Sequence, residues 1–182
     1  MIDLEIIGEQ TTFGNLVYLE EHRFDNGKKF PLSYRNFVKR YGYGLTVKLF
    51  IIYIPMDNYP DSWNIRSKEI TSTYKEDVEN GDIWFDLSPD GSEELIKRLI
   101  PFASSENGHY LFWDPETDSE IELDIFITDF KGIGMVKIGR TLDEVIEKLI
   151  DPQLYTSVLP FAKKPFPKEF DSWSVPLQPI HI

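Results

Sequence analysis

The sequence predicts an α+β fold with a single, largely antiparallel sheet and helices packed mainly on one side of it. Between residues 100 and 138, strand-like segments follow one another through short turns, and strands joined in this way pair antiparallel. Segments whose apolar residues recur at helical spacing flank this region. With 182 residues, the chain is long enough for one domain with a substantial core.

The first part of the chain mixes helix and strand signals. Residues 4–7 suit the start of a strand, and residues 16–24 suit a helix. Residues 30–41 have the apolar stripe of an amphipathic helix, with Pro31 in its first turn. Residues 45–55 are nearly all apolar and rich in β-branched side chains, which predicts one strand covered on both faces.

Later segments predict capped helices and a short strand. A narrow apolar stripe indicates a helix over residues 63–78, and alternation indicates a strand over residues 83–87. Ser92 is a suitable N-cap for a short helix, and Thr141 with Glu144 forms a capping box ahead of another.

No periodic pattern follows residue 151, where prolines and aromatic residues become frequent. We therefore expect residues 1–151 to form the domain. Residues 152–182 are expected to be a Pro- and aromatic-rich tail packed on its surface.

The centre of the predicted sheet is an aromatic-rich strand at residues 110–113, a turn at 114–118, and a segment that alternates from Glu120 onward. Successive strand side chains point to opposite faces, so one face should join the core and the other should carry carboxylates. The predicted core set is Ile121, Leu123, Ile125 and Ile127, and the opposite set is Glu120, Glu122, Asp124 and Phe126.

The chain is strongly acidic, with a net charge of −12 from 31 acids and 19 bases. Such a surface repels phosphate backbones and favours encounter with a basic protein, so we expect a protein partner and no nucleic acid. The charge is uneven, because residues 57–151 carry 23 acids and 9 bases, whereas residues 26–56 carry six bases and no acid.

Composition also disfavours several classes of protein. The absence of cysteine excludes disulfides, thiolate metal sites and a cysteine nucleophile. The N-terminus carries acids where a signal peptide needs bases, and the longest apolar run, residues 49–55, is too short to cross a bilayer. We therefore expect a cytoplasmic protein with no membrane partner and no cofactor.

We expect the carboxylate-bearing face to bind the partner, with two aromatic residues exposed beside the carboxylates as anchors. The same pattern is also typical of a solvated sheet face, or of an edge protected against pairing. The predicted partner-binding residues are Trp113, Asp114, Glu116, Asp118, Glu120, Glu122, Asp124 and Phe126, of which Trp113 and Phe126 are the predicted exposed anchors.

The residue pattern disfavours catalysis. The carboxylates are spread along a strand, whereas calcium needs oxygens that converge on one point, so we predict no metal site. His109 lies in a turn with Ser104 and Ser105, but a nucleophile–base pair would need one serine oriented toward the ring. We predict no enzymatic activity and no catalytic residue, and retain a carboxylate-based hydrolase as an alternative.

Several short sequence segments, taken together and in their order along the chain, resemble the SMI1/KNR4 (SUKH) superfamily. Residues 30–37, FPLSYRNF, resemble the early helix of the family, and residues 100–103, IPFA, with residues 108–114, GHYLFWD, resemble its central strand pair. The helix after Arg140-Thr141 resembles its closing helix. The chain departs from the family pattern at His109, where Asp or Asn is common.

The resemblance covers about residues 28–150 and assigns the domain at residues 1–151 to this superfamily. It implies an α+β fold and a binding role without catalysis. Its bacterial members are associated mainly with immunity proteins that neutralise toxins, often nucleases, and its fungal members with cell-wall and signalling regulation. Because nucleases need basic clefts for phosphate, we expect an immunity protein that binds a basic toxin domain through the acidic face. An intracellular regulatory scaffold of the same fold is the alternative.

Overall fold

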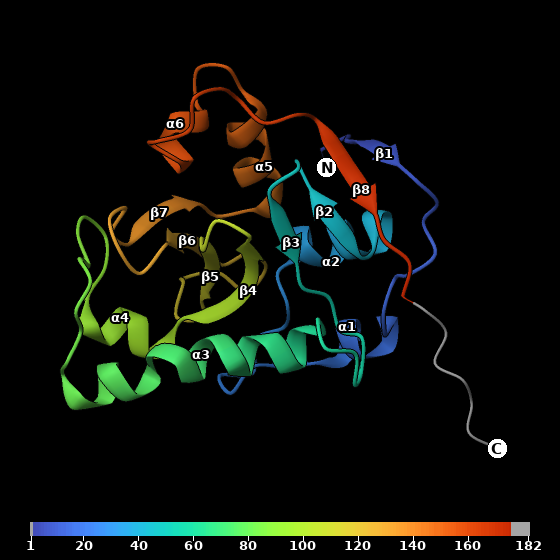
Figure 1. Ribbon diagram of the computed structural model, residues 1–182. Coiled ribbons are helices and arrows are strands. Elements are labelled where there is room, and N and C mark those ends of the chain that lie inside the picture. The colour runs from blue at the N-terminus through green and yellow to red at the C-terminus, as the bar shows by residue number, and fades with distance from the viewer. Residues whose placement is uncertain (1, 176–182) are drawn as a thin grey trace.

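The computed structural model describes residues 2–175 as one eight-stranded sheet with six helices around it (Figure 1). The strand order is β1-β8-β2-β3-β4-β5-β6-β7, in which β1 and β8 are parallel and the other neighbours are antiparallel. The predicted α+β class is confirmed. In chain order the elements are β1 Glu5–Ile7, α1 Leu16–Glu21, α2 Leu32–Tyr41, β2 Gly44–Thr46, β3 Phe50–Ile52, α3 Trp63–Asn80, α4 Glu93–Arg98, β4 Ile100–Ser105, β5 Tyr110–Asp114, β6 Asp124–Thr128, β7 Val136–Gly139, α5 Leu142–Ile150, α6 Tyr155–Val158 and β8 Glu169–Ser172.

The capped helices begin where their capping residues predict. The Ser92 hydroxyl accepts a hydrogen bond from the Leu95 N–H at 3.1 Å at the start of α4. The Thr141 hydroxyl accepts one from the Glu144 N–H at 3.1 Å at the start of α5. These interactions are local in sequence, so the residue pattern alone identifies them.

The single strand predicted over residues 45–55 is wrong. The chain reverses at Val47 and Lys48, whose φ angles are 49° and 55°, so that β2 and β3 pair as a hairpin. A positive φ is unfavourable for a β-branched residue. Val47 is nevertheless fully buried, and its N–H donates to the Glu169 carbonyl at 2.8 Å. Burial and a hydrogen bond to a distant segment therefore offset the local strain.

The strand predicted over residues 83–87 is also wrong, because these residues form an irregular segment. Phe85 packs inward against Phe130, with ring centroids 5.0 Å apart. Its neighbour Trp84 is 64% exposed.

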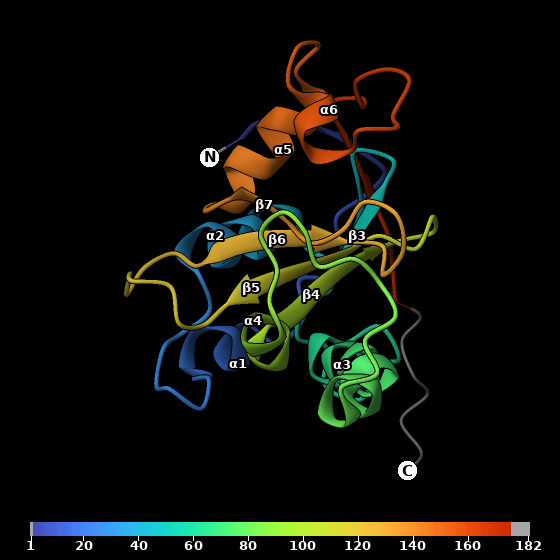
Figure 2. The same cartoon turned by 90° about the vertical axis from the view of Figure 1, so that its left-hand side faces the viewer.

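Aromatic side chains cover both faces of β5. Trp113 stacks on Phe102 of β4 with ring centroids 4.1 Å apart and planes 6° from parallel. Tyr34 of α2 packs edge-on against the same indole at 4.8 Å. The adjacent Phe112 meets Tyr74 of α3 at 6.0 Å. Figure 2 shows α3 below β4, and α5 with α6 above β7.

The segment after residue 151 contributes α6 and β8. Strand β8 lies inside the sheet between β1 and β2, and Phe170 on it is fully buried against Phe37 and Tyr41 of α2. The expected tail also includes residues 176–182, which lie outside the described residues.

Candidate protein-binding surface

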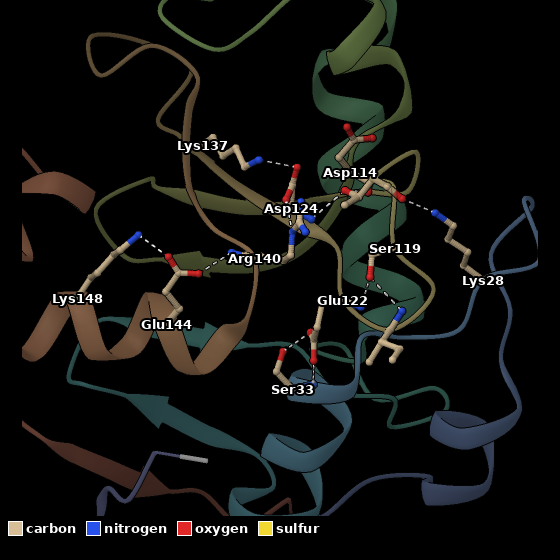
Figure 3. Close-up of polar contacts among 12 residues, drawn as sticks. Lys28, Ser33, Asp114, Ser119, Glu122, Asp124, Lys137, Arg140, Glu144 and Lys148 are labelled. Atoms are coloured by element: carbon tan, nitrogen blue, oxygen red, sulfur yellow. Dashed lines mark hydrogen bonds and ion pairs between the residues drawn. The ribbon is translucent and has the colours of Figure 1, made fainter.

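The carboxylates of the predicted site lie in or next to the connection between β5 and β6, residues 115–123, which we call the acid loop. Figure 3 shows three of them, those of Asp114, Glu122 and Asp124. Two distant side chains hold the backbone of the acid loop in place. The Asn26 amide donates to the Pro115 carbonyl at 2.8 Å, and the Lys28 ammonium donates to the Thr117 carbonyl at 2.5 Å. The Thr117 hydroxyl in turn accepts from the Asp124 N–H at 2.9 Å. The loop is therefore tied at both ends.

Asp114 is a buried, paired carboxylate. It is 7% exposed and accepts two hydrogen bonds from Arg98, from Nε at 2.8 Å and from Nη2 at 2.9 Å. Burial raises the pKa of Asp114, but the hydrogen bonds from Arg98 and from the Glu116 N–H, with the nearby positive charges, outweigh it and lower the pKa overall. Most of its charge is therefore satisfied inside the molecule.

Asp124, at the start of β6, is also paired. Its carboxylate accepts from the Lys137 ammonium at 2.6 Å and from the Arg140 Nε at 3.0 Å (Figure 3). Two cations on one carboxylate reverse the local charge, so Asp124 adds little negative potential toward solvent.

Glu122 caps a helix from a distant part of the chain. The N-cap of α2 is Pro31, which provides no side-chain hydrogen bond. One Glu122 oxygen accepts from the Ser33 N–H at 2.8 Å, and the other accepts from the Ser33 hydroxyl at 2.7 Å (Figure 3). That hydroxyl also accepts from the Leu142 N–H at the start of α5, at 3.0 Å. Glu122 therefore joins the acid loop, α2 and α5.

The position of Glu122 affects its ionisation. Burial raises the pKa of Glu122, and the hydrogen bonds from Ser33 only partly counter this effect. The charge of Asp143 adds to the increase.

The predicted exposed anchors Trp113 and Phe126 are wrong. Trp113 is 0% exposed and Phe126 is 6% exposed. The prediction assumed that the face opposite Ile125 and Ile127 meets solvent, but four successive residues of β6, from Ile125 to Thr128, are buried. The exposed tryptophan is Trp84, whose indole N–H donates to the Asp77 carboxylate at 3.2 Å.

The alternating strand begins later than predicted, and this frees one apolar side chain. Strand β6 starts at Asp124, so Ile121, predicted to be core, lies in the acid loop and is 61% exposed. Its carbonyl accepts from the Leu32 N–H at 3.0 Å, and Leu32 itself is 39% exposed. Two residues with exposed apolar side chains are thus joined through their backbones. The sequence contains no signal for this pair, because the alternation assigns Ile121 to the interior.

Three predicted carboxylates remain exposed in the acid loop, namely those of Glu116, Asp118 and Glu120. Within residues 2–175, no ion pair engages them. They are neighbours of Ile121 in the same loop. The loop therefore exposes an apolar side chain together with three carboxylates, and protein–protein interfaces combine apolar and polar groups in this way.

The basic face of α2 is less available than its sequence suggests. Arg35 and Lys39 both pair with Glu20 of α1, at 2.7 and 2.5 Å. Arg40 pairs with Asp3. These pairs neutralise much of the positive segment within the molecule.

The Ser105 hydroxyl lies 3.0 Å from Nδ1 of His109, so the orientation that a nucleophile–base pair requires is present. The same hydroxyl accepts from the His109 N–H at 3.2 Å, and Ser105 is only 8% exposed. The contact thus closes the turn between β4 and β5. Among residues 2–175, no group of three or more His, Asp or Glu side chains is placed to hold a metal ion, and no helix is long and apolar enough to cross a bilayer.

Comparison with known proteins identifies one family. No curated protein matches the chain, and no solved structure matches it. The family SUKH_6, described as "SMI1-KNR4 cell-wall", matches residues 24–144, from just before α2 into the start of α5. This match covers more than half of the chain, contains β4, β5 and the acid loop, and confirms the resemblance. The chain therefore belongs to the SMI1-KNR4 (SUKH) family.

Proposed function

We propose that this chain is a non-catalytic immunity-type domain that neutralises a toxin by covering a basic surface of the toxin domain. The observation that carries the proposal is the exposed Ile121, 61% accessible, among three unpaired carboxylates of one loop. Membership in a family that is generally non-catalytic supports a binding role. The net charge of −12 supports a positively charged partner.

The two parts of the surface have separate physical roles. Exposed carboxylates attract a basic partner over several ångströms and raise the association rate, an effect that salt screens. An apolar side chain buried at the centre of an interface mainly slows dissociation. The partner-binding set therefore becomes Glu116, Asp118, Glu120, Ile121 and Leu32, while Asp114, Glu122 and Asp124 support it from within.

Reversing the three exposed charges is expected to slow association. In Glu116→Lys, Asp118→Lys, Glu120→Lys, the association rate should fall by about ten- to a hundredfold at low salt, because electrostatic steering is lost. High salt should reduce the difference in association rate between the native chain and this variant, because salt screens the charges. The test measures binding kinetics with the toxin domain encoded beside this chain's gene or, failing that, with the protein that co-purifies from the native cell.

The matched control carries the same charge change elsewhere. Glu21→Lys, Glu76→Lys, Glu147→Lys reverses three exposed carboxylates on α1, α3 and α5. It should slow association much less than the acid-loop variant. Equal effects of the two variants would mean that only net charge matters and that the acid loop is not the contact surface.

The variant Ile121→Ser tests the apolar part of the surface. Its association rate should stay nearly unchanged and its dissociation rate should rise, because an apolar side chain at the centre of an interface mainly slows dissociation. The same binding kinetics measure both rates.

An intracellular regulatory scaffold of the same fold is a second candidate, favoured by the description of the matched family, which names the cell wall. Such a protein would bind its partner through another surface. Binding that survives the acid-loop reversal unchanged would favour the scaffold over the immunity protein.

A further inference from the structure

The end of the sheet opposite the acid loop holds a small apolar cavity. Because neighbouring strands run antiparallel, the connections β2–β3, β4–β5 and β6–β7 all lie at this end, away from the β5–β6 connection. Residues 159–166, which follow α6, close over them. The cavity has a volume of about 190 Å³, and seven of its nine lining residues are apolar.

Each of the four segments contributes to the wall. Leu49 comes from the β2–β3 hairpin, His109 from the β4–β5 turn and Ile133 from the β6–β7 connection, and Phe161 and Phe166 come from the closing segment. Backbone hydrogen bonds hold that segment in place. Within the segment, the Ala162 N–H donates to the Leu159 carbonyl, and the Phe166 N–H ties the segment to α5 by donating to the Leu149 carbonyl, both at 3.0 Å. The cavity is therefore built into the fold.

The size of the cavity suits one aromatic ring. Apolar cavities of about 150 Å³ in another protein bind benzene, so about 190 Å³ accommodates a six-membered ring with one small substituent. Phe161, which lines the cavity, is 80% exposed. A bound ring would shelter part of it from water.

The two polar residues of the lining are Asn107 and His109, and the proposal concerns the imidazole of His109. Its Nδ1 is engaged by the Ser105 hydroxyl at 3.0 Å, which orients the ring. Among the described residues, none hydrogen-bonds to Nε2, which leaves this nitrogen for a molecule in the cavity. Burial lowers the pKa of His109, while the charge of Asp129 opposes this. A neutral imidazole can exchange a hydrogen bond with an uncharged hydroxyl.

We propose that this cavity binds a single aromatic ring bearing a hydroxyl group, with the ring between Leu49, Ile133 and Phe166 and the hydroxyl against Nε2 of His109. Both a free phenolic compound and a tyrosine side chain of another chain have this chemistry. The site is separate from the acid loop, and its closing segment lies beyond the matched family region of residues 24–144. It does not depend on the proposed toxin-binding function.

The test titrates the full chain with p-cresol, toluene and N-acetyl-L-tyrosinamide while amide resonances are followed by NMR. We expect saturable shifts at His109, Ile133 and Ala162 with p-cresol, and binding roughly three- to tenfold tighter than that of toluene because of one hydrogen bond. Binding of p-cresol alone would indicate a small-molecule site. Comparable binding of the tyrosine amide would indicate a side-chain site.

Two variants complete the test. Ala162→Leu should fill the cavity and abolish the shifts, whereas Lys163→Ala, at the exposed neighbouring position, should leave them unchanged. His109→Phe keeps an aromatic ring of similar size and should remove the preference for p-cresol over toluene. Absence of saturable shifts, or shifts that persist in Ala162→Leu, would overturn the site. A preference that persists in His109→Phe would overturn the role of the histidine.

Discussion

Replacing Trp113 by alanine is expected to lower the free energy of unfolding by about 3–5 kcal/mol, as for other large core side chains. The indole is 0% exposed and stacks on Phe102 with ring centroids 4.1 Å apart. Its removal leaves a cavity between β4, β5 and α2, in addition to the loss of buried apolar area. Urea unfolding followed by circular dichroism measures the change.

The chain offers a matched control for this prediction. Trp84→Ala removes the same side chain from a site that is 64% exposed, so the free energy of unfolding should change by at most about 1 kcal/mol. If Trp113→Ala were tolerated as well as Trp84→Ala, Trp113 would not be part of the core. In that case the prediction from the sequence, that Trp113 is an exposed anchor for the partner, would hold.

Replacing Glu122 by alanine is expected to cost about 2–3 kcal/mol. The carboxylate is the side-chain cap of α2, and loss of a cap costs about 1 kcal/mol. The Ser33 N–H and hydroxyl would also lose their acceptor in a partly buried site, which adds about 1–2 kcal/mol. Asp118→Ala removes an exposed carboxylate of the same loop and should change stability by less than about 0.5 kcal/mol. Equal costs for the two variants would contradict the capping role.

Glu122→Gln tests the ionisation of the same side chain. Because the folded pKa is raised above the unfolded value of 4.5, Glu122 contributes stability that is present below pH 4.5 and is lost as the pH rises through the folded pKa. The glutamine variant lacks this dependence. The native chain should therefore exceed Glu122→Gln in free energy of unfolding by more at acidic pH than at neutral pH. Urea unfolding of the two proteins at each pH measures this difference. A difference independent of pH would contradict the raised pKa.

Features whose causes are local in sequence were predictable. The caps Ser92 and Thr141 make the expected hydrogen bonds three residues ahead, and the helical stripe over residues 63–78 forms α3. The acidic character of residues 114–124 follows directly from composition. Short-range hydrogen bonds and apolar periodicity do not depend on what packs from elsewhere, so these predictions agree with the structure.

Features that depend on distant segments were not predictable. Val47 turns the chain within an apolar run because it is buried and its N–H donates to the carbonyl of Glu169. The distribution of free charge in the site has a similar origin. Arg98 neutralises Asp114, and Lys137 with Arg140 neutralises Asp124. None of these cations is adjacent in sequence to the carboxylate that it pairs with.

The sequence by itself therefore determined the α+β class, the capped helices and a cluster of carboxylates between two central strands. Only the tertiary structure decided which of those carboxylates remain free, that Trp113 is core, and that Ile121 is exposed. The physical reason is that alternation along a strand distinguishes its two faces but contains no information about what covers each face. In this protein, aromatic rings and cations from distant segments cover most of the face that carries the charges.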